Sequence, residues 1–248
     1  MSKGTGLGDN LYVAGYNVSG DVGQLQRIGG GPALLEVTGI DKSAVERLGA
    51  VRDGSIDFTS FFNKAALQEH VALSGLPTTD VLLTYFRGTT LGNPAAGLEA
   101  KQVGYDGTRG EDGSFTFDVS AVANGFGIEF GRSLTAGVRT DSGATSGSSI
   151  DYGAAVGQTV LGAQAYLQVF AFTGTDVTIT VQDSTNDSAW ASLVAFTAVS
   201  SGPTDERVAT SGSTTVDRYI RVTTTTSGGF SDLDFAVMVV KNETAVVF

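Results

Sequence analysis

The hydrophobic pattern of the first half of the chain predicts strands. In residues 56–61, apolar and polar positions alternate with a period of two, which is typical of a half-buried strand. Ile56 and Phe58 are therefore expected to face a core. Asp57 and Thr59 are expected to face away from it. Further strands are expected over residues 33–38, 81–86, 98–103, 114–119 and 127–130.

Two short helices are expected to interrupt these strands. Ser43 and Glu46 have the spacing of a capping box, which predicts a helix that runs through Leu48 and ends at Gly49. Asn63 is a candidate N-cap for a second helix over residues 64–73, which Gly75 and Pro77 would end.

The glycine-rich segments divide the chain. Nine of the first 31 residues are glycine and no regular hydrophobic period accompanies them, so residues 1–32 are expected to form an arm that orders only against a partner. Residues 33–140 are expected to form one domain. Gly, Ser, Thr and Ala dominate residues 141–157, which are expected to be a linker.

Residues 158–248 are expected to form a second β domain. Six strand-like segments follow one another there with no helical pattern between them, which favours an antiparallel β-sandwich. The fold class is thus mainly β, with an N-terminal β-sandwich or barrel followed by this second sandwich. Its strands are expected over residues 166–172, 177–181, 193–198, 207–210, 218–222 and 233–240.

Composition and charge exclude several functions. The 248 residues contain no cysteine, which excludes disulfide scaffolds, thiolate zinc sites, iron–sulfur clusters and thiol nucleophiles. The net charge is −11, with 11 basic and 16 acidic residues in residues 1–150 and 4 and 10 in residues 151–248. A dedicated nucleic-acid-binding protein would need clustered Lys and Arg instead. No apolar run reaches the length of a membrane helix, and no membrane partner is expected.

No catalytic constellation is recognisable, so we expect no enzyme activity, no cofactor and no metal. His70 is the single histidine and no Gly-x-Ser-x-Gly motif occurs, so His70 is expected to be a structural or interface residue. Oxygen ligands in residues 183–187 could hold calcium, but the spacing of a calcium loop is missing and a polar turn is favoured. Trp190, flanked by Ala189 and Ala191, is expected to be buried in the core.

The order of motifs in the first half is strand, Asp-Gly turn, strand and helix, and then a hairpin with Asp-Gly-Ser-Phe. These motifs lie in residues 51–63, 76–80, 84–88 and 105–131. In this order and texture, residues 30–140 resemble the tail tube (major tail) proteins of long-tailed bacteriophages. The second half is similar to the β-sandwich appendages that such virion proteins carry, and it could equally belong to a capsid decoration protein.

The resemblance implies self-assembly into stacked rings, hexameric or pseudo-hexameric, in the virion tail. The inner sheets of such rings join around a lumen through which the double-stranded DNA genome passes during ejection without specific binding. Assembly would take place in the bacterial host cytoplasm, and the other partners would be the tape measure, terminator and distal tail proteins. The alternative is a capsid decoration or host-surface (glycan) binding virion protein.

The acidic balance would then have a role, because carboxylates that line the lumen repel phosphate. Asp57, Asp118 and Glu129 are the candidates for lumen-facing residues, because each is a polar residue within a strand that alternates with apolar positions. Ordinary outward-facing strand carboxylates are the alternative, since a shift of one residue in strand register exchanges the two faces.

Overall fold

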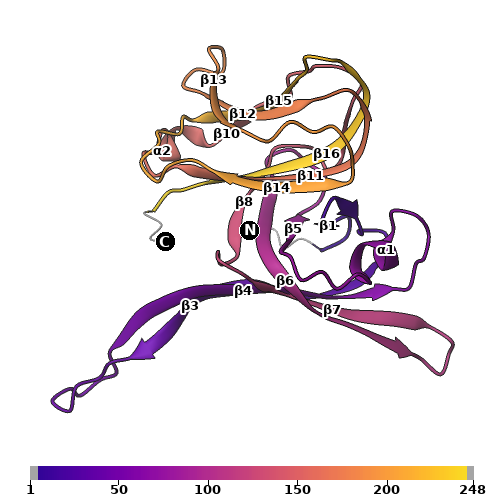
Figure 1. The fold of residues 1–248 in the computed structure, drawn as a ribbon. Helices are drawn as coiled ribbons and strands as arrows, with labels where there is room; N and C mark the ends of the chain where they lie inside the picture. The colour runs from indigo at the N-terminus through magenta and orange to yellow at the C-terminus, as the bar shows by residue number, and fades with distance from the viewer. Residues whose placement is uncertain (1–4, 245–248) are drawn as a thin grey trace.

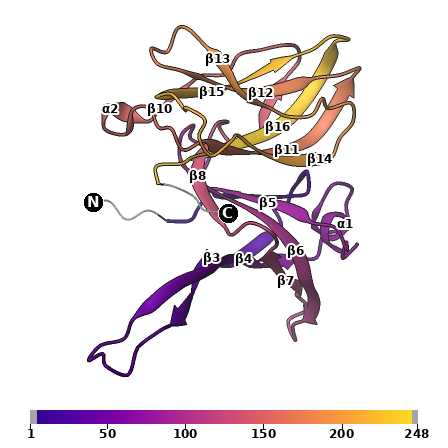
Figure 2. The same ribbon diagram turned by 60° about the vertical axis from the view of Figure 1, so that its left-hand side comes forward.

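The computed structural model describes residues 5–244 of the chain. Within that range the chain forms a twelve-stranded and a four-stranded sheet, both antiparallel, and two short helices. Figures 1 and 2 show a sandwich made from the second half of the chain, with the strands of the first half beside it and two hairpins projecting from them. The predicted mainly β class with antiparallel sheets and short helices is confirmed.

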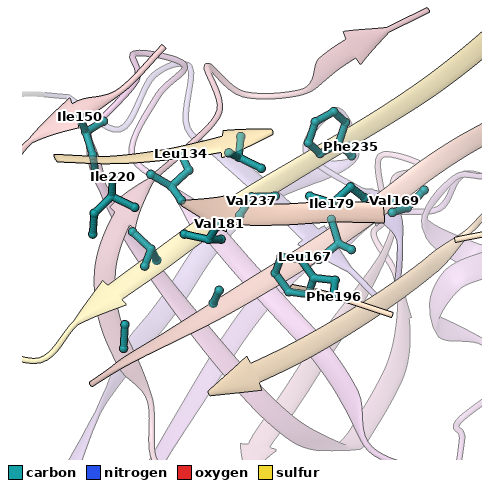
Figure 3. Close-up of a cluster of buried hydrophobic side chains, with 14 of the residues drawn as sticks. Leu134, Ile150, Leu167, Val169, Ile179, Val181, Phe196, Ile220, Phe235 and Val237 are labelled. Carbon is teal, nitrogen blue, oxygen red and sulfur yellow. The ribbon is translucent and has the colours of Figure 1, made fainter. Parts of the chain in front are cut away.

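The sandwich encloses the larger hydrophobic core. One layer contains β11 (Ala163–Gly174), β14 (Thr204–Ala209) and β16 (Phe230–Lys241), and the other contains β10 (Ile150–Asp151), β12 (Thr178–Ser184), β13 (Ala191–Ala195) and β15 (Tyr219–Thr225). Figure 3 shows the side chains between these layers, where Leu167, Ile179 and Phe235 are at most 1% exposed. Alternation along each strand puts such apolar residues on the inner face.

The large sheet continues from the sandwich into the first half of the chain. Strand β8 (Glu129–Ser133) pairs with β16 on one side and with β6 (Pro94–Arg109) on the other. Gly131 lies at this junction, where a β-carbon would be 2.1 Å from the carbonyl oxygen of Val239, so only glycine fits there. The sheet then continues through β5 (Val81–Phe86) to β1 (Asn10–Val13) and β2 (Tyr16–Asn17).

A second layer covers this part of the sheet. It consists of β3 (Val22–Glu36), β4 (Arg47–Phe61), β7 (Phe115–Ala123) and the last third of β6, in the order β3–β4–β7–β6. Strand β6 belongs to both layers, since its first residues pair with β5 and residues 104–109 pair with β7. A second core, with Phe58 and Leu98 fully buried, fills the space between the layers next to α1 (Glu69–Leu73).

Residues 141–157 form hydrogen bonds and strand pairs with the sandwich. Strand β9 (Arg139–Asp141) pairs with β16, and the helix α2 (Gly153–Val156) follows β10. The amide of Thr145 donates a hydrogen bond of 2.9 Å to Thr224 Oγ1. The division of the chain into an arm, a ring-forming domain, a linker and a sandwich stays a prediction, and residues 1–4 of the arm lie outside the described residues.

Two expectations for secondary structure, both for helices, are wrong. Residues 43–46 form no helix, and Leu48 belongs to β4, where it pairs with Leu35. The second helix is confined to α1, because Asn63 Oδ1 accepts the amide of Ala65 in a turn that precedes it. The glycine-rich start contains β1, β2 and the beginning of β3, and in β1 the three residues after Asn10 are buried.

Candidate assembly and channel surfaces

The layer β3–β4–β7–β6 has a polar face on the side away from its core. In β4, Ile56 and Phe58 are fully buried, whereas Asp57 and Thr59, which alternate with them, are partly exposed. Pairing brings Asp57 opposite Ser120 and Thr59 opposite Asp118 on β7. Because residues opposite each other in an antiparallel pair lie on the same face, these four side chains form one patch. We refer to this patch, together with Arg27 and Asp106, as the polar face.

Hydrogen bonds between hydroxyl groups and carboxylates connect the strands of the polar face. Ser55 Oγ donates to Asp57 Oδ2 at 2.8 Å, and Ser120 Oγ donates to Asp57 Oδ1 at 2.5 Å. Thr59 Oγ1 donates to Asp118 Oδ1 at 2.6 Å. Both carboxylates are therefore held in place by neutral donors.

Carboxylates outnumber cations on the polar face. Arg27 of β3 lies opposite Asp57, but Asp106 of β6 lies directly opposite Asp118. Like charges at opposed positions destabilise a strand pair, so folding alone does not account for this arrangement. Asp106 was not among the sequence-predicted residues, since its register with Asp118 depends on a shift in pairing between Gln102 and Gly104.

The layer β3–β4–β7–β6 ends in an unpaired strand edge on each side. Among the described residues, β3 pairs only with β4, and residues 104–109 of β6 pair only with β7. An open edge exposes a row of backbone N–H and C=O groups that can pair with another chain. The two edges belong to different strands, so a contact between the β3 edge of one copy and the β6 edge of the next would be head-to-tail.

The outer half of the β3–β4 hairpin exposes apolar side chains. It projects away from the remainder of the molecule in both views (Figures 1 and 2). A two-stranded ribbon has little stability of its own, and clustered exposed apolar residues indicate a binding surface. The large apolar residues in this hairpin that are at least 41% exposed are Leu34, Leu35, Val37, Ile40, Val45, Leu48 and Val51.

Glu129, the third sequence-predicted candidate, does not lie on the polar face. Its side chain is 3% exposed and forms an ion pair of 2.9 Å with Arg207 of β14, which is 6% exposed. The hydroxyl of Tyr166 on β11 donates a hydrogen bond to the same carboxylate. Burial and the neighbouring Glu129 raise the pKa of Tyr166, so this hydroxyl stays a donor. The structure brings Asp57 and Asp118 together and leaves Glu129 at the junction between the two halves of the chain.

His70 lies in an aromatic cluster at the base of the β6–β7 hairpin. Its Nδ1 is 2.8 Å from the hydroxyl of Tyr105, and its ring contacts Phe62 and Phe117. Among the described residues, no group of His, Asp and Glu side chains could hold a metal ion. In the same part of the chain no helix is long and apolar enough to cross a membrane.

Trp190 does not lie in the core, so the prediction for it is wrong. It precedes β13 in a loop, is half-buried, and lies under the guanidinium of Arg221 at 4.2 Å from the ring centroid. Phe196 fills the neighbouring core position instead and is 3% exposed. The small flanking residues Ala189 and Ala191, taken as a sign of burial, are both exposed.

Comparison with solved structures gives phage tail and baseplate proteins as structural neighbours. A protein from the tail of an empty GTA particle, refined with C6 symmetry, is similar over 52% of this chain and 98% of its own, at 16% identity and a TM-score of 0.40. The SPP1 Dit protein, described as a paradigm of the hub adsorption apparatus in phages that infect Gram-positive bacteria, is similar over 94% and 98%, at 12% identity and a TM-score of 0.32.

A chain of the phage P2 baseplate in its activated conformation with Ca is similar over 95% of this chain and 99% of its own, at 10% identity and a TM-score of 0.30. All three TM-scores are below 0.5, so no function follows from these similarities. No protein-family model matches the chain. No curated protein matches it either.

Proposed function

We propose that the chain is a structural subunit of a phage tail that assembles with copies of itself into closed, stacked rings. The rings are hexameric or pseudo-hexameric, and the polar face lines a lumen through which double-stranded DNA passes. Tape measure, terminator and distal tail proteins are the further partners of such a tube.

The observation that carries the proposal is the layer with two open edges. Pairing the edge of β3 in one copy with residues 104–109 of β6 in the next would satisfy both rows of backbone groups. A head-to-tail contact of this kind produces a ring when its rotation closes. The apolar outer part of the β3–β4 hairpin extends beyond its own subunit and would be covered by a neighbouring copy.

The polar face supports the inner position of this layer. A surface that DNA passes without being held should carry few free cations, because each Lys or Arg near phosphate adds binding free energy. Asp57, Asp106 and Asp118 give the polar face a net negative charge beside the single Arg27. Glu129 is excluded from this role by its buried ion pair with Arg207.

Native mass spectrometry and negative-stain electron microscopy of the purified full chain test the proposal. We expect closed rings of about six subunits of 25.5 kDa each, and stacks of rings at high protein concentration. Monomers that persist at about 100 μM would contradict it, since a hydrophobic interface of standard size is stable at that concentration. Immunolabelling that places the protein on the capsid shell would favour the decoration alternative.

A further inference from the structure

The two open edges of the layer β3–β4–β7–β6 carry side chains of opposite charge on the polar face. On the β3 edge this side chain is Arg27, which lines a hollow of the polar face together with Asp57 and Ser120. On the β6 edge it is Asp106, whose Oδ2 lies 3.5 Å from where a β-carbon at Gly104 would be. Arg27 and Asp106 are both exposed.

Neither side chain is paired within its own chain. Among residues 5–244, Arg27 and Asp106 take part in none of the ion pairs or side-chain hydrogen bonds. The strands β4 and β7 lie between them, so the two side chains are about 14 Å apart along the sheet, too far for an ion pair. Because Asp106 lies opposite Asp118, a cation from a second copy would relieve a repulsion that folding leaves in place.

The edges of neighbouring copies would meet as an antiparallel pair. Three antiparallel pairings lead from β3 through β4 and β7 to β6, so β6 runs opposite to β3. When β3 of one copy joins β6 of the next, the alternation of strand directions continues. Opposed residues of an antiparallel pair have β-carbons at most about 5.5 Å apart, which an arginine and an aspartate can easily span.

We propose that Arg27 of one copy pairs with Asp106 of the next and that this ion pair sets the register in which the ring closes. The inference rests on the proposed ring assembly and names the residues through which a second copy is recognised. Within one copy, the row of opposed residues that contains Arg27 ends at Gly104 on β6. Pairing Arg27 with Asp106 therefore shifts the row by two residues at each boundary between copies. An even shift keeps the polar face continuous, and a closed barrel requires a stagger of its strands.

Two glycines leave room for this pair. In the same register Gly29 lies opposite Gly104, because Gly29 follows Arg27 by two residues and Gly104 precedes Asp106 by two. Arg27 Nε lies 3.8 Å from where a β-carbon at Gly29 would be, and Asp106 Oδ2 lies at the corresponding distance of 3.5 Å for Gly104. Both charged side chains therefore lean toward the row of the two glycines, where they would meet.

The pair also suits a surface that DNA passes. A free guanidinium near phosphate would add binding free energy. Pairing with Asp106 of the next copy neutralises Arg27, so the polar face keeps the carboxylates of Asp57 and Asp118 and no unpaired cation.

Charge reversal at each position, alone and combined, tests the pair. Arg27→Asp puts two carboxylates at every boundary, and Asp106→Arg puts two guanidinium groups there, so each variant should need at least about tenfold more protein to assemble than the unaltered chain. The double variant Arg27→Asp with Asp106→Arg has opposite charges at each boundary again and should form rings of unaltered mass. Lys64→Asp, which reverses an exposed cation outside both edges, is the control and should assemble as the unaltered chain does.

An equimolar mixture of Arg27→Asp and Asp106→Arg gives the decisive measurement. Opposite charges meet only where unlike copies are neighbours, so the mixture should form rings in which the two variants alternate. With one variant isotopically labelled, native mass spectrometry should find equal numbers of each in every ring. Circular dichroism of each variant alone checks its fold. If a variant does not fold, Arg27→Gln, Asp106→Asn and their combination decide, because removing both partners should weaken assembly no more than removing one.

The outcomes separate this pair from ring assembly itself. Rings formed by either reversal variant at the concentration that the unaltered chain needs would overturn the pair and leave the proposed function standing. A mixture of folded variants that forms no rings, or additive effects of Arg27→Gln and Asp106→Asn, would do the same. An unaltered chain that stays monomeric would overturn both.

Discussion

Glu129 and Arg207 form the buried ion pair at the junction of the two halves of the chain. Arg207 Nε and Nη2 each donate to the Glu129 carboxylate at 3.0 Å, and the guanidinium lies 3.7 Å from the ring centroid of Phe126. Burial lowers the pKa of Arg207, but Glu129 and Tyr166 raise it by more, so Arg207 stays protonated. The carboxylate therefore connects β8 to β14 and β11 and is not available to a lumen.

Glu129→Gln should destabilise the fold, because it leaves the guanidinium of Arg207 buried without a counter-charge. We expect the free energy of unfolding to fall by about 3 kcal/mol, the usual cost of removing one partner of a buried pair. Urea denaturation followed by circular dichroism measures it. Glu111→Gln, at an exposed position of the β6–β7 turn, is the control and should change stability by less than about 0.5 kcal/mol. A loss below about 1 kcal/mol at Glu129 would show that the pair is not buried as described.

Asp205 of β14 gives the protein a pH-dependent stability. Burial raises the pKa of its carboxyl group to about 6, the amide of Leu82 opposes this rise, and Glu99 adds to it. The folded chain then binds this proton more tightly than the unfolded chain does. The contribution of Asp205 to the free energy of unfolding should therefore fall as the pH rises from about 4 to about 6, and stay low above that.

Asp205→Asn removes this titration. At pH 7 the variant should be more stable than the unaltered chain by about 1–2 kcal/mol, and at pH 4 the two should be nearly equal. Urea denaturation at a series of pH values between 4 and 7 gives the difference. Asp41→Asn, at an exposed position of the β3–β4 turn, should show no such trend. A difference between Asp205→Asn and the unaltered chain that does not vary with pH would contradict the assignment.

At the scale of the elements, local sequence signals predict a strand or helix correctly where the long-range strand pairing favours the same element. Strand β5 has the bounds that the sequence predicts, because residues 81–86 are apolar except for Thr84 and lie between the turn signals Pro77 and Gly88. The helix predicted from Ser43 and Glu46 does not form, because β3 and β4 pair as far as Glu36 and Arg47, and the amide of Glu46 donates to Thr38 Oγ1 instead. Long-range pairing overrides a capping signal that is only four residues long.

The candidate surfaces are only partly predictable from the sequence, because they too depend on long-range strand pairing. The pattern of β4 was sufficient to place Asp57 on an outward face, but the position of Asp106 depends on the register of β6 against β7. Strand β1 is not recognisable in the sequence, because the apolar run Leu11, Tyr12 and Val13 is too short to show a period. The strand forms because its backbone pairs with β5. Glu129 is a lumen-facing candidate in the sequence because the partner that buries it, Arg207, lies 78 residues away and leaves no sign in the local pattern.

The β3–β4 hairpin is the element on which ring assembly should depend. Leu35 and Leu48 are opposite each other, and both are 57% exposed, so Leu35→Lys with Leu48→Lys should leave the fold intact. Because a ring would cover these side chains, we expect the double variant to be monomeric by native mass spectrometry. Val160→Lys is the control, since Val160 is 60% exposed in the second half of the chain and should not affect assembly. Rings of unaltered mass in the double variant would exclude this hairpin from the interface.

At the scale of the whole molecule, the polar face and the four-stranded sheet of the sandwich lie far apart. The polar face belongs to the layer β3–β4–β7–β6, and the four-stranded sheet lies on the other side of the molecule in Figure 1. The continuous pairing through β8 holds the two halves of the chain in one body. In a ring whose lumen is formed by the polar face, the four-stranded sheet would therefore lie away from the lumen.

Reversing the charge of the polar face should make the assembled protein retain DNA. Each Asp118→Lys substitution replaces a carboxylate with a cation in every subunit, and only charges within about 8 Å of the duplex act on it at physiological salt. We expect the variant rings to retain double-stranded DNA in a filter-binding assay at about 50 mM salt and to release it at about 200 mM, whereas unaltered rings retain none. Asp187→Lys makes the same change in net charge on an exposed loop of the sandwich and should behave as the unaltered protein. Equal retention by the two variants would mean that Asp118 does not face the passing DNA.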